Sequence, residues 1–258
     1  KQPDSSRQEM IDRQEDVLKI VECASLVHDL GNPPYGHFGE DIIRQWFKKN
    51  LPNILRERSD VADEFLSSPY VNDFYRFEGN AQSLRIVSKL HDFKGKFEGL
   101  DLTVATLNTI LKYTYSSCHK KTKEITSKKV GYFYSEEEAF KTVTKITGTG
   151  TNRHPLTYIL EAADDIAYLV ADMEDAIGKG VISFRDVREF LLENLSNDAY
   201  QSPHSVHTRE LLTTIDEEVF SVNRFFVDLR DKLIDGARHN FVNHFDEIMA
   251  GMFNQDLF

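Results

Sequence analysis

Apolar residues recur at helical spacing along most of the chain. The first such stripe runs from about residue 10 to residue 28, and a second helix is predicted from about 38 to 49. Helical periodicity returns over 81–90 and over 104–111, whereas residues 50–76 are mixed and predict short helical or irregular pieces. The longest predicted helix starts near Pro155, a residue suited to a first turn, and ends near residue 176.

The remaining pattern is also helical. Ser183 is placed to cap a helix that carries Val187 and Leu191, and further helical segments are expected near 208–235 and 239–252. Only residues 128–134 are patterned like a short hairpin strand. We therefore predict an all-α fold, with at most one short β-hairpin, in a single domain over residues 1–258.

Composition limits the class of protein. A net charge of -11 and a pI near 5.3 argue against general affinity for nucleic acid or membranes. No run of about 18 apolar residues and no signal-peptide core is present, so we expect a cytoplasmic protein with no membrane partner. Cys23 and Cys118 form no zinc-type pair and are expected to be reduced. Because the chain begins with Lys rather than Met, we expect a fragment.

One stretch reverses the acidic balance. Between Leu111 and Val130 the chain carries six lysines and one glutamate. Such a concentration of positive charge favours an anionic ligand, although lysines in a solvated loop are the alternative interpretation.

The most informative stretch runs from Leu26 to Glu40. His28 falls on the apolar stripe of the first helix, four residues after Ala24, so its side chain is expected to face the core. Asp29 follows it directly, and the prolines and glycines over 31–36 then impose a stiff turn. Adjacent imidazole and carboxylate groups at a helix end suit one cation, although a capped helix end would use the same residues.

A second acidic pattern lies in the long helix. Asp164, Tyr168 and Asp172 are spaced four residues apart and therefore share one face, beside an apolar stripe. A buried carboxylate costs several kcal/mol unless it is paired or binds a metal. The two patterns together favour a metal site more than either does alone. A purely structural role for these side chains remains the alternative.

Three segments in order resemble one enzyme family. They are residues 28–40 (HDLGNPPYGHFGE), 77–82 (FEGNAQ) and 161–168 (EAADDIAY). Together they resemble the HD-domain deoxynucleoside triphosphate triphosphohydrolases of the bacterial dGTPase type. The resemblance implies an all-α HD fold and a reaction that releases intact triphosphate from dGTP, or another dNTP, to leave the deoxynucleoside.

The resemblance also implies a metal site and a catalytic pair. His28, Asp29 and Asp164 match metal ligands, for which Mn²⁺ or Mg²⁺ is expected. The family's first histidine ligand has no counterpart, so we expect the fragment to lack an N-terminal helix as well as the C-terminal part of the enzyme. His37 matches the catalytic histidine, and Glu40 is placed to orient it.

Further matches concern the substrate. The positions that the resemblance assigns to contacts with phosphates or sugar are Asn80, Lys112, Tyr113, Lys129, Tyr168 and Asp172. Glu78 is expected to be structural, and Arg76 receives no role. The family also suggests a homo-oligomer, a hexamer, with dNTPs or single-stranded DNA as effectors.

Two alternative functions remain open at this point. One is an HD phosphohydrolase that acts on another nucleotide. The other is a nucleotide-sensing or single-strand DNA-binding module in which the HD site is inactive.

Overall fold

The computed structural model describes residues 3–91, 99–119, 123–194, 208–209, 212–213 and 222–257. Within these residues the secondary structure is helical, which confirms the all-α class. The chain divides into two compact units, one of residues 1–160 and 246–255 and one of residues 161–245 and 256–258. The single-domain organisation stays a prediction.

The first unit begins with α1 (Pro3–Asp12) and α2 (Gln14–Val27). Ala24 of α2 is fully buried in an apolar cluster with Val87, Ile110 and Leu160. The predicted first helix is therefore present, but it is interrupted at Arg13.

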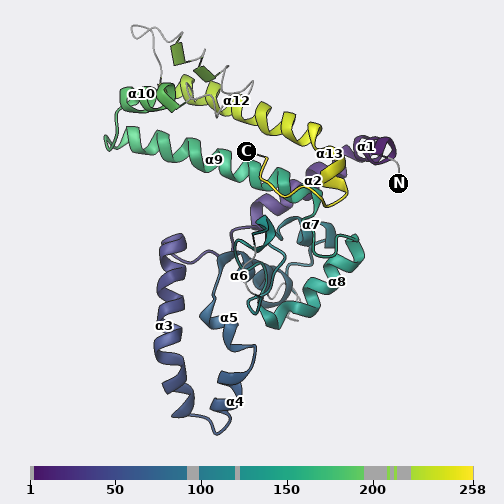
Figure 1. Ribbon diagram of the computed structural model, residues 1–258, viewed down its shortest axis with the longest axis vertical. Helices are drawn as coiled ribbons and strands as arrows, with labels where there is room; N and C mark the ends of the chain where they lie inside the picture. The colour runs from purple at the N-terminus through teal and green to yellow at the C-terminus, as the bar shows by residue number, and fades with distance from the viewer. Residues whose placement is uncertain are drawn as a thin grey trace. The chain divides into compact units, whose positions relative to one another are not determined.

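The next three helices form an arm of the first unit. Figure 1 shows α3 (Gly36–Arg56) running beside α4 (Ala62–Ser67) and α5 (Val71–Tyr75). The α3 helix continues seven residues beyond its expected end at 49, through Pro52. Edge-to-face aromatic packing fixes this part of α3, since Phe47 lies 5.0 Å from Phe74 between ring centroids. Tertiary packing here outweighs the local cost of a proline.

The centre of the first unit is built from short helices. They are α6 (Gly79–Arg85), the π-helix η1 (Ile86–Leu90), α7 (Val104–Thr109), the 3-10 helices η2 (Ile125–Ser127) and η3 (Tyr134–Glu136), and α8 (Glu137–Thr147). Their core contains Leu84, Leu111 and a stacked pair, Tyr132 and Phe140, with ring centroids 4.1 Å apart.

The short strand expected over 128–134 is reduced to a single bridge. Tyr132 pairs with Ser116 in parallel orientation, and the described residues contain no strand. A Cβ on Gly131 would overlap the carbonyl of Tyr113, so the two segments cross closely at this glycine. Residues 128–134 therefore approach the segment around Tyr113 and Ser116 closely at one point, and the two segments do not form a ladder of strand hydrogen bonds.

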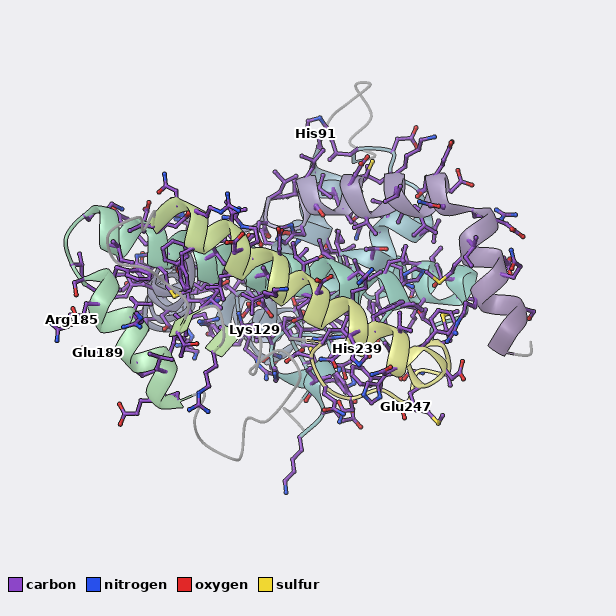
Figure 2. The ribbon with its side chains drawn as sticks, turned by 90° about the horizontal axis from the view of Figure 1, so that it is seen from above. His91, Lys129, Arg185, Glu189, His239 and Glu247 are labelled. Carbon is purple, nitrogen blue, oxygen red and sulfur yellow. The ribbon has the colours of Figure 1, made fainter. Side chains whose placement is uncertain are left out.

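The second unit packs around a separate core. Helix α9 (Pro155–Gly178) starts in the first unit and continues into the second, where α10 (Phe184–Asn194) and α12 (Val222–Asn243) join it. Val170 and Phe226 are fully buried in this core. In Figure 2, Arg185 and Glu189 lie side by side on α10, with Nε 2.9 Å from Oε1. After α12 the chain forms α13 (Phe245–Met249), of which all residues but Phe245 belong to the first unit.

The helices predicted from Pro155 and after Ser183 are confirmed. The hydroxyl of Ser183 accepts the backbone N–H of Asp186, which is the expected cap. Of the segment expected over 208–235, most residues before 222 lie outside the described ranges. No helix among the described residues is long and apolar enough to cross a membrane.

Candidate active site

The turn between α2 and α3 is fixed from the neighbouring α6. The hydroxyl of Ser83 donates to the carbonyl of His28 at 2.6 Å and accepts the backbone N–H of Gly31 at 2.9 Å. A Cβ on Gly31 would overlap the backbone of Gly79 and Ser83, so only glycine permits this approach. The turn ends at Tyr35, which has a left-handed φ of 67° immediately before α3. His28, before the turn, and His37, after it, are thereby held by one rigid connection.

His28 and Asp29 lie together at the end of α2. The Nε2 atom of His28 is 3.5 Å from Oδ1 of Asp29, and the His28 side chain is 12% exposed. Its Nδ1 atom is 2.9 Å from the carbonyl of Ser25, an acceptor, so Nδ1 carries the proton. A backbone carbonyl that holds the proton on one ring nitrogen, with the other ring nitrogen turned towards a carboxylate, is an arrangement typical of metal-binding histidines. This donor set fits a divalent cation.

Asp164 lies on α9 in the second unit. Its role as a third ligand therefore stays a prediction from the sequence. Tyr168 and Asp172 lie on the same helix, and both are exposed. Their roles at the substrate also stay predictions.

His37 and Glu40 form a pair on the first turn of α3. Nδ1 of His37 lies 3.0 Å from Oε2 of Glu40, and the imidazole is 72% exposed while the carboxylate is 2% exposed. The other carboxylate oxygen of Glu40 accepts the backbone N–H of Gly79 at 2.8 Å. The imidazole is thus exposed to ligands and oriented by a carboxylate that cannot easily move.

Lys129 reaches the second nitrogen of the same imidazole. Its Nζ atom lies 2.9 Å from Nε2 of His37, and 3.9 Å from Oε1 of Glu78. Lys129 comes from the segment between η2 and η3 and is labelled in Figure 2. The structure therefore brings together His37, Glu40 and Lys129, three residues that the sequence assigned to one site.

Glu78 is a second buried carboxylate beside this group. Burial raises its pKa, and the nearby Glu40 raises it further. Arg44 offsets part of this negative charge, because its guanidinium lies 3.5 Å from Glu78 and 3.9 Å from Glu40. Asn80 donates to Oε1 of Glu78 at 3.2 Å, which places this predicted substrate residue at the edge of the cluster.

A cavity of about 380 Å³ lies beside the group formed by His37, Glu40, Glu78 and Lys129. Its lining carries both signs of charge and comprises His37, Glu40, Asp41, Arg44, Lys48, Tyr75, Arg76, Glu78, Lys129 and Val130. A polar cavity with several cations and an oriented histidine can hold an anionic group and move a proton.

The same carboxylates also suggest a second cation site. His37, Glu40 and Glu78 offer ligand atoms within 4.8 Å of one another. However, the cations of Arg44 and Lys129 already lie beside them. Proton transfer therefore agrees better with the charges present than metal binding does.

Lys112 and Tyr113 are not among the residues that line this cavity. Both are buried, and the carbonyl of Lys112 accepts Nε of Arg153 at 2.7 Å. Arg153 also lies over the ring of Tyr113, with its guanidinium carbon 5.7 Å from the ring centroid. Their contact with substrate phosphates stays a prediction.

The residues of the site that sequence reasoning missed include Arg44 and Glu78. Arg44 was given no role, although it lies one helical turn after Glu40 and therefore on the same face. The sequence predicts a structural role for Glu78, although this residue lies within one of the three family-like segments. Spacing could have identified Arg44, whereas only the fold reveals the neighbours of Glu78.

Comparison with known proteins identifies relatives of this chain. A protein of Listeria monocytogenes named "Deoxyguanosinetriphosphate triphosphohydrolase-like protein" is 43% identical over 249 residues, which cover 95% of this chain. The chain is homologous to proteins of the dGTPase type. The resemblance drawn from the three segments is therefore confirmed over nearly the whole chain. No family model matches the sequence.

Two other relatives extend the comparison. The "Deoxyguanosinetriphosphate triphosphohydrolase" of Yersinia enterocolitica is 35% identical over 92% of this chain. The "Probable deoxyguanosinetriphosphate triphosphohydrolase" of Pseudomonas aeruginosa is 34% identical over 92% of it. The chain covers 53%, 52% and 51% of the lengths of the three relatives, so it spans about half the length of the proteins it matches.

Proposed function

We propose that this chain carries catalytic residues of a metal-dependent triphosphohydrolase that converts dGTP, or another dNTP, to deoxynucleoside and intact triphosphate. The observation that carries the proposal is the His37–Glu40–Lys129 group, in which an exposed imidazole is oriented by a buried carboxylate beside a lysine. The names of the homologues supply the substrate class.

The metal would be held by His28 and Asp29, with Asp164 as the predicted third protein ligand. The hydrogen bond from His28 to Ser25 places the ring proton on Nδ1, so Nε2 is the nitrogen that would bind such a cation. A bound Mn²⁺ or Mg²⁺ would polarise a phosphate oxygen and lower the pKa of water.

The residues of the cavity would supply the remaining chemistry. His37 would transfer a proton at the attacked phosphate or at the leaving group, because its imidazole faces the cavity. Glu40 would stabilise the imidazolium that forms when His37 takes up a proton. Lys129 and Arg44 would offset the negative charge that the triphosphate brings.

The reaction products test the activity. The complete gene product, incubated with dGTP and Mn²⁺ or Mg²⁺, should release deoxyguanosine and tripolyphosphate in equal amounts. Release of pyrophosphate or of single phosphate groups would contradict the proposal. Hydrolysis of a cyclic nucleotide or a nucleoside monophosphate, with dNTPs left intact, would favour the alternative HD phosphohydrolase.

Metal analysis separates the two groups of residues. His28→Ala and Asp164→Ala should abolish metal binding, whereas His37→Ala should lose turnover and retain the metal. If dGTP stabilised the protein thermally but no nucleotide were hydrolysed with any divalent metal, the nucleotide-sensing alternative would replace the enzyme. Assembly into a hexamer and control by dNTPs or single-stranded DNA remain predictions.

A further inference from the structure

The ammonium group of Lys129 lies against Nε2 of His37, the nitrogen that faces away from Glu40. We propose that the Lys129 ammonium covers Nε2 of His37 until a phosphate anion draws it away, so that the imidazole can exchange a proton only when phosphates are in place. This second role for Lys129 rests on the proposed function, because it assumes that His37 is the proton-transfer group.

The hydrogen-bond chemistry of the three groups determines the state of the imidazole. Glu40 accepts at Oε1 from the backbone of Gly79 and receives Nδ1 of His37 at Oε2, so Nδ1 carries a proton. An ammonium group can donate hydrogen bonds but cannot accept them. At 2.9 Å from Lys129, Nε2 must therefore be the acceptor, and the imidazole is neutral with its lone pair occupied.

The Lys129 ammonium is held weakly enough that a phosphate can compete with His37 and Glu78 for it. Its side chain is 32% exposed, and its carboxylate neighbour, Glu78 at 3.9 Å, is shared with Arg44 and Asn80. A phosphate chain offers several charged oxygens and makes shorter, charge-assisted hydrogen bonds. His37 cannot follow the ammonium, because Glu40 is buried and anchored to Gly79. Movement of Lys129 towards an anion would thus leave Nε2 free.

The first test measures the reactivity of Nε2 without any nucleotide. Diethylpyrocarbonate reacts with an unprotonated imidazole nitrogen, and mass spectrometry of the peptide that contains His37 gives the rate. Lys129→Met should raise this rate about fivefold, which corresponds to the loss of one ordinary hydrogen bond. Lys48→Met, which removes another lysine of the same cavity, should leave the rate unchanged. Equal rates in Lys129→Met and wild type would overturn the proposal.

The second test measures the effect of an anion. In ¹⁵N spectra of histidine-labelled protein, with His37 assigned from a His37→Gln sample, tripolyphosphate should move the wild-type Nε2 signal towards its position in Lys129→Met. The anion should move the Lys129→Met signal much less. A wild-type signal that high concentrations of tripolyphosphate leave in place would overturn the proposal. Failure of the proposed function is distinguishable, since it would appear as absent dGTP hydrolysis with the Nε2 results unchanged.

Discussion

The carboxylate of Glu40 joins His37 to the start of α6. One oxygen lies 3.0 Å from Nδ1 of His37, and the other accepts the backbone N–H of Gly79 at 2.8 Å. The exposed imidazole is therefore oriented by a group that is 2% exposed and tied to a second helix. This relationship makes Glu40 a positioning residue whose effect can be measured separately from binding.

Replacing Glu40 with glutamine should reduce turnover far more than substrate binding. The amide keeps the shape of the side chain but loses the charge that stabilises a protonated His37. We expect kcat for dGTP to fall about 100-fold, the usual size of a general acid–base contribution, with KM changed little. Steady-state kinetics and metal content check this. Glu57→Gln, an exposed change at the far end of α3, is the matched control. A large rise in KM at constant kcat would show that Glu40 acts in binding instead.

The sequence predicted those parts of the fold and site that depend on local spacing. The α9 helix follows its apolar stripe from Pro155, and the His37–Glu40 pair follows from a separation of three residues on one helix. The end of α3 was misplaced because Pro52 resembles a stop, while packing of Phe47 on Phe74 keeps the helix intact.

Contacts between residues far apart in the sequence could not be predicted from local spacing. Lys129 lies 92 residues after His37 along the chain, and only the family resemblance placed it in the site. The role of Glu78 depends on the close approach of α6 to Gly31, which no periodicity records. Residues whose function depends on burial among distant neighbours therefore required the structure.

Replacing Gly31 with alanine should destabilise the first unit and disturb the site. The new methyl group would overlap the backbone of Gly79 and Ser83, and backbone atoms cannot move aside as a flexible side chain would. We expect a loss of about 1–3 kcal/mol in the free energy of unfolding. Urea unfolding followed by the fluorescence of Trp46, the single tryptophan, reports on this unit. Gly178→Ala should be neutral or slightly stabilising, because nothing lies near its added Cβ at the end of α9. Equal effects of the two changes would contradict the steric argument.

Asp73 should be far more important for stability than an exposed aspartate nearby. It is 5% exposed and accepts hydrogen bonds from Ser117, Ser135 and the backbone of Tyr134, with Arg85 at 3.7 Å. Asp73→Asn should cost about 3 kcal/mol, because the amide has one accepting oxygen in place of two and leaves partly buried donors without an acceptor.

The matched control for Asp73 is Asp63→Asn. Asp63 pairs with Arg56 at 3.0 Å but is 82% exposed, so solvent screens the pair and the loss should be less than about 1 kcal/mol. Urea midpoints at pH 7 for both variants measure the difference. A similar loss in each would show that the buried network around Asp73 adds nothing to stability.

His154 should make the first unit less stable as the pH falls. Burial lowers its pKa from 6.5 to about 4, so the folded chain holds this imidazole neutral while the unfolded chain protonates it. Because the unfolded state binds more protons between these values, stability is fully present above pH 6.5 and declines as the pH falls towards 4. Between pH 7 and pH 5 the wild type should lose about 2 kcal/mol more than His154→Gln, which cannot take up a proton. Unfolding by urea at the two pH values, followed through Trp46, gives this difference directly, and parallel pH dependences in the two proteins would show that His154 is not the group responsible.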